Sequence, residues 1–150
     1  MHDRWQRADT PQNRVRYLTA LADFTPPALV ERTLALYLSP DVGIQDGPGA
    51  IGQALANRHA RRATWDLLEG QWEQVMAKYP PFTLVGLLFP IATTVEDDLG
   101  DRMAAFFRDH PLAEVGAQLA QFLELQTVHR SFAHRVAGQL AHELSVPADR

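Results

Sequence analysis

The sequence predicts an all-α fold, and three observations support this. Apolar residues recur every three or four positions along most of the chain and hardly ever alternate as in a half-buried strand. Proline and glycine stand at the starts and ends of the apolar segments, where helices begin and end. The 150 residues fit one domain, which can bury about two-thirds of the surface that the unfolded chain exposes.

The N-terminal part is predicted to hold two helices. Thr10-Pro11 and Thr25-Pro26 each have the form of an N-cap residue followed by proline at the first helical position. The apolar residues after each pair share one helical face, and the second helix ends near residue 38. These residues are Val15, Leu18 and Leu21 in the first helix, and Leu29, Val30, Leu34 and Tyr37 in the second.

The stretch "SPDVGIQDGPG" (residues 39–49) interrupts this pattern because its prolines and glycines do not propagate a helix. A short helix that carries Ile51, Ala54 and Leu55 is expected to follow. Its N-cap is expected near Asp46 or the next residue.

Three glycines in this region, Gly47, Gly49 and Gly52, have the G-x-G-x-x-G spacing of a dinucleotide-binding loop. Such a loop needs a β-strand that leads into its first glycine and a helix that receives the pyrophosphate. Here a predicted helix, residues 26–38, precedes the glycines, and no segment could pair as a parallel sheet. We therefore interpret the glycines as a turn between two helices.

Three further helices are predicted in the middle of the chain. The first carries a wide apolar stripe and ends at Tyr79 before two prolines. The second, residues 82–93, is apolar nearly all round and should be buried and kinked or shortened at Pro90. Thr94 is expected to cap the third, with Asp97 at N3. The apolar residues are Trp65, Leu68, Trp72, Val75, Met76 and Tyr79 in the first, Leu84, Val85, Leu87, Leu88, Phe89 and Ile91 in the second, and Leu99, Met103, Phe106 and Phe107 in the third.

The C-terminal part is predicted to form two helices with a joint between residues 125 and 128, and residues 145–150 are expected to fray. About eight helices of similar length favour antiparallel pairs stacked as a HEAT- or armadillo-like solenoid, with a closed helical bundle as the alternative. No sequence repeat is visible. The inward residues are Leu112, Val115, Leu119, Phe122 and Leu123 on the first helix, and Val128, Phe132, Val136 and Leu140 on the second.

The composition argues against several classes of function. The chain has no cysteine, which rules out disulfides and thiolate chemistry and suits a cytoplasmic protein. A net charge of −4 gives the whole chain no electrostatic reason to bind nucleic acid or an anionic membrane. The charged N-terminus does not resemble a signal peptide, and the most apolar run, residues 84–92, is too short to cross a bilayer. We expect a soluble, cytoplasmic protein.

No group of residues predicts a self-sufficient active site. His142 and Glu143 begin like the zinc-protease motif H-E-x-x-H, but Val146 stands where the second histidine would be. His129 and His134 are five residues apart and so point to different sides of a helix. We expect no catalytic residue and no metal site in this chain.

The most basic segment, residues 57–65, contains Arg58, Arg61 and Arg62. In one interpretation Arg58 and His59 offset the carbonyl end of a helix, while Arg61 and Arg62 are solvated at the start of the next. One cluster does not outweigh the net negative charge enough to favour nucleic acid. A single carboxylate, such as a peptide C-terminus, needs far less. The three arginines are therefore the candidate peptide-binding residues.

A longer motif extends from Ser39 to Tyr79 and resembles the C-terminal helical domain of zinc aminopeptidases of the aminopeptidase N and puromycin-sensitive aminopeptidase type. In that family a helix ends in a Ser/Asn-x-x-(Val/Ile)-(Arg)-x-Gln-Asp turn, and a later helix carries Trp-x6-Trp and closes at Tyr. The likeness continues in "RADTPQNRVRYLTALADF", "RMAAFFRDHP" and "LAQFLELQTVHRSFAHR". The matching positions are Ser39, Val42, Gln45, Asp46, Arg61, Trp65, Leu67, Leu68, Trp72 and Tyr79.

The resemblance implies a non-catalytic stack of helices that covers the chamber of a zinc-dependent aminopeptidase and contacts the distal part of peptide substrates. Domains of this family are longer, so residues 1–150 would form the second half of one, and the zinc would lie in the catalytic domain of the same polypeptide. Gly43 stands where many relatives have a basic residue, so a contact made by that residue is not expected here.

An alternative function is a free-standing helical-repeat scaffold that binds a partner protein on its concave face. If the chain is part of a longer stack, its first helices should expose an apolar face and tend to self-associate.

Overall fold

The computed structural model describes residues 2–145, which contain α-helices, short 3-10 helices and no strand, so the predicted all-α fold is confirmed. No helix in this range is both long and apolar enough to cross a membrane. The α-helices are α1 (His2–Gln6), α2 (Pro11–Ala20), α3 (Pro27–Leu38), α4 (Gly47–Ala56), α5 (Arg61–Gly70), α6 (Trp72–Lys78), α7 (Val85–Leu88), α8 (Asp97–Asp109) and α9 (Gly116–Ser145). The 3-10 helices are η1 (Leu21–Asp23), η2 (Pro81–Thr83), η3 (Phe89–Thr93) and η4 (Ala113–Val115).

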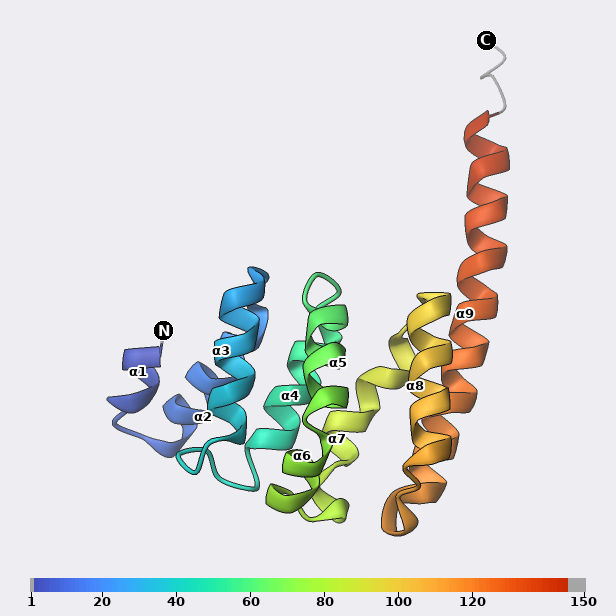
Figure 1. Cartoon of the computed structure of the whole chain (residues 1–150). Helices are drawn as coiled ribbons and strands as arrows, with labels where there is room; N and C mark the ends of the chain where they lie inside the picture. The colour runs from blue at the N-terminus through green and yellow to red at the C-terminus, as the bar shows by residue number, and fades with distance from the viewer. Residues whose placement is uncertain (1, 146–150) are drawn as a thin grey trace.

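The helices run across the molecule from α1 at one end to α9 at the other, broadly in chain order, with α6 turned back below α4 and α5 (Figure 1). Helices α3, α4 and α5 alternate in direction, and so do α8 and α9 (Figure 1). The joints at residues 21–26, 57–60 and 94–96 therefore lie along one edge, which we call the upper edge. Helix α9 passes this edge and continues beyond it (Figure 1). The HEAT-like solenoid arrangement stays a prediction.

The start of α2 is as predicted, because the Thr10 hydroxyl accepts a hydrogen bond from the Asn13 N–H at 3.2 Å. Helix α3 begins one residue later than expected. Pro26 is its N-cap and Pro27 its first residue, so Thr25 does not cap it. Proline sets the φ angle that a helix needs, and either member of the pair can begin it.

The predicted cap of α8 is wrong. Glu96 is the N-cap, without a side-chain cap bond, and Asp97 is the first residue of the helix. Thr94 is buried instead, and its hydroxyl donates to the carbonyl oxygen of Pro90 at 3.3 Å. The cap prediction failed because the Thr94 hydroxyl binds a carbonyl in the first turn of η3 instead of a backbone N–H of α8.

The predicted helix that ends at Tyr79 is two helices. Gln71, with φ −120° and ψ 20°, lies outside the helical region and separates α5 from α6. The break follows Gly70, which costs a helix interior more backbone entropy than other residues do. The apolar stripe nevertheless continues across the break. Trp65 and Trp72 are both buried, and each contacts the rings of two phenylalanines of α8.

The segment between α6 and α8 is buried as predicted but is not one helix. It consists of η2, the single turn α7 and η3. Helix α7 ends at Leu88, and Pro90 lies in the first turn of η3. A proline lacks the N–H that an α-helix would need at this point, which accounts for the shortening.

The joint predicted between residues 125 and 128 is absent, because α9 is continuous from Gly116 to Ser145. No proline or glycine lies between residues 117 and 137 to break it. The predicted inward face of its second half is also wrong, since the side chains of Val128, Phe132 and Leu140 are 56%, 55% and 55% exposed. The predicted fraying concerned residues 145–150, of which 146–150 lie outside the described residues.

Two features near the N-terminus differ from expectation. Helix α1 was not predicted, yet its Trp5 is 2% exposed and belongs to the core. Val15, which was expected to face inward, is 41% exposed. A five-residue helix is too short to show a periodic pattern, so its burial depends on contacts with α2 that the sequence does not display.

Candidate functional site

The G-x-G-x-x-G glycines lie within helix α4, neither in a turn nor in a phosphate-binding loop. A Cβ atom at Gly47 would overlap the hydroxyl group of Tyr79, and one at Gly52 would overlap the carbonyl oxygen of Gly86 in α7. A helix precedes them, as expected, but the interpretation as a turn is wrong. The glycines allow α7 and Tyr79 to pack directly against the backbone of α4.

Arg61 is an internal residue that closes the C-terminal end of α4. Its side chain is 8% exposed, its Nε donates to the Leu55 carbonyl at 2.8 Å, and its Nη2 donates to the Ala56 carbonyl at 3.3 Å. Its Nη1 pairs with the Glu96 carboxylate at 2.9 Å. These groups satisfy the last carbonyls of a helix. The interpretation of Arg61 as a solvated cation is therefore wrong, and its guanidinium is occupied by the protein itself.

Arg62 is exposed, and its Nη1 lies 2.8 Å from the Asp98 carboxylate of α8. This hydrogen bond raises the pKa of Arg62 and lowers the pKa of Asp98 from their ordinary values. Exposed pairs of this kind contribute little to stability. The cation therefore has a partner that a competing carboxylate could replace.

Arg58 is exposed at the upper edge, and its Nε donates to Nε2 of His59 at 3.2 Å. None of the carboxylates that the structure describes pairs with it. The preceding residue holds the loop in place, because Asn57 Nδ2 donates to the Ala22 and Phe24 carbonyls at 3.2 and 3.3 Å. Of the three candidate arginines, Arg58 is the one that the described part of the chain leaves available on a fixed loop.

Ion pairs also join α5, α8 and α9 along one surface, which the sequence analysis did not foresee. Hydrogen bonds from His134 and then Arg130 lower the pKa of Asp97 from its ordinary value. The Asp97 carboxylate thereby holds α9 to the start of α8. The other pairs are Arg102 with Asp66 and Glu69, and Arg130 with Asp101.

The tyrosine that ends the family-like motif has a structural role. The Tyr79 hydroxyl donates to the Tyr37 carbonyl, and the Tyr37 hydroxyl donates to the Leu18 carbonyl at 2.8 Å. Lys78 Nζ donates to the same Tyr37 carbonyl at 2.9 Å. Burial raises the pKa of both tyrosines above its ordinary value. These bonds fix the end of α3 against α6.

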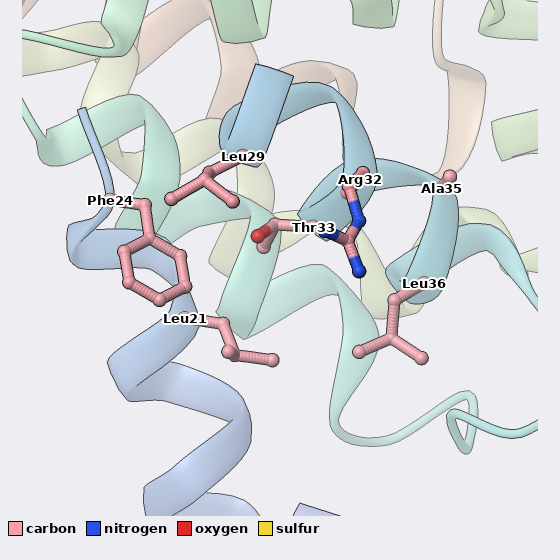
Figure 2. A pocket seen from close by; sticks show the side chains of 7 residues that line it. All are labelled: Leu21, Phe24, Leu29, Arg32, Thr33, Ala35 and Leu36. Carbon is pink, nitrogen blue, oxygen red and sulfur yellow. The ribbon is translucent and has the colours of Figure 1, made fainter. Parts of the chain in front are cut away.

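A shallow apolar hollow of about 340 Å³ lies between η1 and α3 (Figure 2). Phe24, Leu29 and Leu36 are half-buried at its wall, and Arg32 adds a cation to the lining. The hollow leaves these apolar side chains only partly covered, and the prediction of an exposed apolar face on the first helices stays a prediction. Whether this surface mediates self-association stays a prediction.

Among the side chains that the structure describes, no group of three or more His, Asp or Glu residues is placed to hold a metal ion. The side chains of His142 and Glu143, and the residue at 146, lie outside the described part, so the H-E-x-x-V segment is not part of this statement.

The chain was compared with known protein families. Residues 1–127 match the ERAP1-like C-terminal domain. The matched range includes α1 to α8 and the first part of α9, and its motif residues Val42, Arg61, Trp65, Trp72 and Tyr79 are all buried. The motif therefore describes the packing of this helical body. The chain belongs to the family of ERAP1-like C-terminal domains, found in aminopeptidases of the M1 type.

Proposed function

We propose that this chain is a non-catalytic C-terminal helical domain of a zinc-dependent aminopeptidase, in which it covers the active-site chamber and contacts the distal part of peptide substrates. Family membership supports the link to a catalytic domain of the same polypeptide. In this proposal the zinc ion belongs to that domain, and residues 1–150 are the second half of the C-terminal domain. A cytoplasmic location stays a prediction from the absence of cysteine.

The proposed peptide contact is based on which partners the three arginines have in the structure. Arg61 is used inside the protein and Arg62 pairs with Asp98, whereas Arg58 faces solvent beside His59. A guanidinium can bind a carboxylate through two parallel N–H donors. Because Asn57 fixes the loop, little backbone entropy is lost when a ligand binds.

Such a contact is useful to an enzyme whose chemistry occurs elsewhere. Binding energy from a remote part of a peptide can position the scissile end in the catalytic domain. A single exposed cation gives a weak contact, so the isolated chain should bind a short peptide in the millimolar range, which is about 4 kcal/mol. The assignment thus predicts weak but carboxylate-dependent binding.

The test is an NMR titration of the ¹⁵N-labelled chain with a short peptide that has a free C-terminal carboxylate, and with the same peptide as its C-terminal amide. We expect the free acid to shift the backbone amides of residues 57–62, and the amide to shift them much less. Arg58→Gln should abolish the difference, whereas the matched control Arg108→Gln, at an exposed site on α8, should keep it. Equal shifts from the two peptides would contradict the proposed contact.

A further inference from the structure

The second half of α9, residues 128–145, is called the projecting half here. Its first turns still contact η3 and α8 through His129, Arg130 and His134, and the rest of it extends beyond the upper edge (Figure 1). It carries a row of large apolar side chains without a cover. Phe132 and Leu140 are each 55% exposed, and Leu144 is 84% exposed. Phe132 and Leu140 border a groove of about 540 Å³ whose other wall includes Val95, itself 41% exposed.

This row continues the buried face of the same helix. Leu119 and Gln126 face the body and are 6% and 2% exposed. Ala133 and Leu140 follow them at steps of seven residues, which is close to two helical turns, and so lie on nearly the same side. The first half of this side packs on η3 and α7. Farther along the helix this side extends past η3 and α7, and no other described segment covers it there.

The family match ends at residue 127, immediately before the projecting half.

We propose that the projecting half of α9 is the interface between two copies of this chain, which pair as antiparallel helices. A two-fold axis near Val136 and Ala137 makes the face complementary to itself, because Ala133 of one copy then lies opposite Leu140 of the other. Leu144 of one copy enters the groove of the other, beside its His129. The alanines let the two helix axes approach to the 8–10 Å of a packed pair.

The charges of the projecting half are compatible with this pairing. Arg130 and His134 are directed to Asp97 on α8. The Arg135 guanidinium lies over the Phe132 ring at 5.7 Å and so lies at the border of the face. Among the side chains that the structure describes, the pairing therefore buries no ion pair, whose desolvation would offset the gain from apolar burial.

The available area also fits a second copy. Covering this row, Val95, Val136 and the alanines of the same face removes roughly 500–600 Å² from each copy, about 1,000–1,200 Å² in total, which is the lower end for a specific interface. An interface of this size formed by exposed apolar side chains predicts a dimer with a dissociation constant in the micromolar range.

Sedimentation of the 150-residue chain over a range of concentrations tests the proposal. We expect the mass to rise from the 16.8 kDa monomer toward twice that value. Val136→Glu together with Leu140→Glu should weaken the dimer about 30-fold or more, as expected for central interface residues. Their circular dichroism should match that of the wild-type chain, because both side chains are at least partly exposed.

Two matched controls address other apolar surfaces. Phe82→Glu changes a 62% exposed aromatic residue outside α9, and Leu29→Glu changes the hollow between η1 and α3. Both should leave the dimer intact. A wild-type chain that stays monomeric at sub-millimolar concentration overturns the proposal. So does a dimer that Leu29→Glu dissociates while the α9 variant does not.

The orientation can be read from single cysteines, because the chain has none of its own. Ala137→Cys lies near the proposed two-fold axis and should form an intermolecular disulfide on mild oxidation. Leu144→Cys should not, because the antiparallel arrangement separates its two copies by about 20 Å, far beyond disulfide reach. Cross-linking through both positions indicates parallel helices and overturns the antiparallel arrangement.

Discussion

Helix α4 and the projecting half of α9 are both short amphipathic helical segments, but the apolar side of α4 is buried and that of the projecting half is exposed. Helix α4 is surrounded by α3, α5 and α7, and its Ile51 is 0% exposed. In the projecting half, Phe132 and Leu140 are each 55% exposed. A periodic pattern thus indicates which side of a helix is apolar, but the length of the neighbouring elements decides whether that side is covered.

The largest expected effect contrasts two phenylalanines. Phe107 is 4% exposed and packs against the rings of Trp65 and Trp72 at 5.8 and 5.7 Å. Phe107→Ala should lower the free energy of unfolding by about 3–5 kcal/mol, because it leaves a cavity in the core. Phe132→Ala should change it by less than about 0.5 kcal/mol in the dilute chain. Urea denaturation of both variants measures this, and similar losses would show that the projecting half is packed.

A second contrast concerns close backbone packing. Gly52→Ala should destabilise the chain by about 2–3 kcal/mol, because its Cβ meets the Gly86 carbonyl and α7 must shift away. Gly49→Ala is the matched control in the same helix, since a Cβ there meets nothing within 4 Å. The change in unfolding free energy in urea distinguishes the two. If Gly52→Ala were as mild as the control, α4 and α7 would not be in direct backbone contact.

A third contrast separates the two neighbouring arginines. Arg61→Met removes the donor that serves the Leu55 and Ala56 carbonyls and should cost about 2 kcal/mol, because buried carbonyls lose a partner. Arg62→Met breaks an exposed pair with Asp98 and should cost less than about 1 kcal/mol. Thermal unfolding of both variants gives the comparison. An equal cost would contradict the internal role of Arg61.

The smallest effect is expected in the projecting half itself. Gly138 is an exposed helical residue with open space around it. Gly138→Ala should stabilise the local helix by about 0.5–1 kcal/mol, because alanine loses less backbone entropy than glycine does. Far-UV circular dichroism should show more helix at unchanged cooperativity of unfolding. A loss of helix would mean that another segment covers this position.

These contrasts also show which features the sequence could predict. The start of α2 depends on Thr10 and Pro11, and the interruption of the helices after residue 38 depends on prolines and glycines, so local residues determine them. The break at Gln71 and the continuity of α9 were missed. At Gln71 the helix breaks although the apolar stripe of the sequence continues. In α9 the apolar residues shift to other positions near residue 128, which suggested a joint, but the helix continues and those residues are exposed.

For the candidate site, the sequence indicated which residues to consider but not what each of them does. The basic composition of residues 57–65 drew attention to three arginines, but it did not separate their roles. Arg61 is internal because Glu96, 35 residues later in the chain, lies beside the end of α4. A contact over that separation depends on the packing of α5 and the segment before α8. Periodicity within one helix contains no information about it.

Amide hydrogen exchange of the dilute chain tests most directly the claim that a packed body carries an uncovered helix end. The account predicts slow exchange, at the rate of global unfolding, for the amides of residues 50–56 in α4. We expect exchange at least 100-fold faster for residues 138–144, which open locally because no ion pair or hydrogen bond of the described residues ties them to the body. Equal protection of the two segments in the monomer would contradict it.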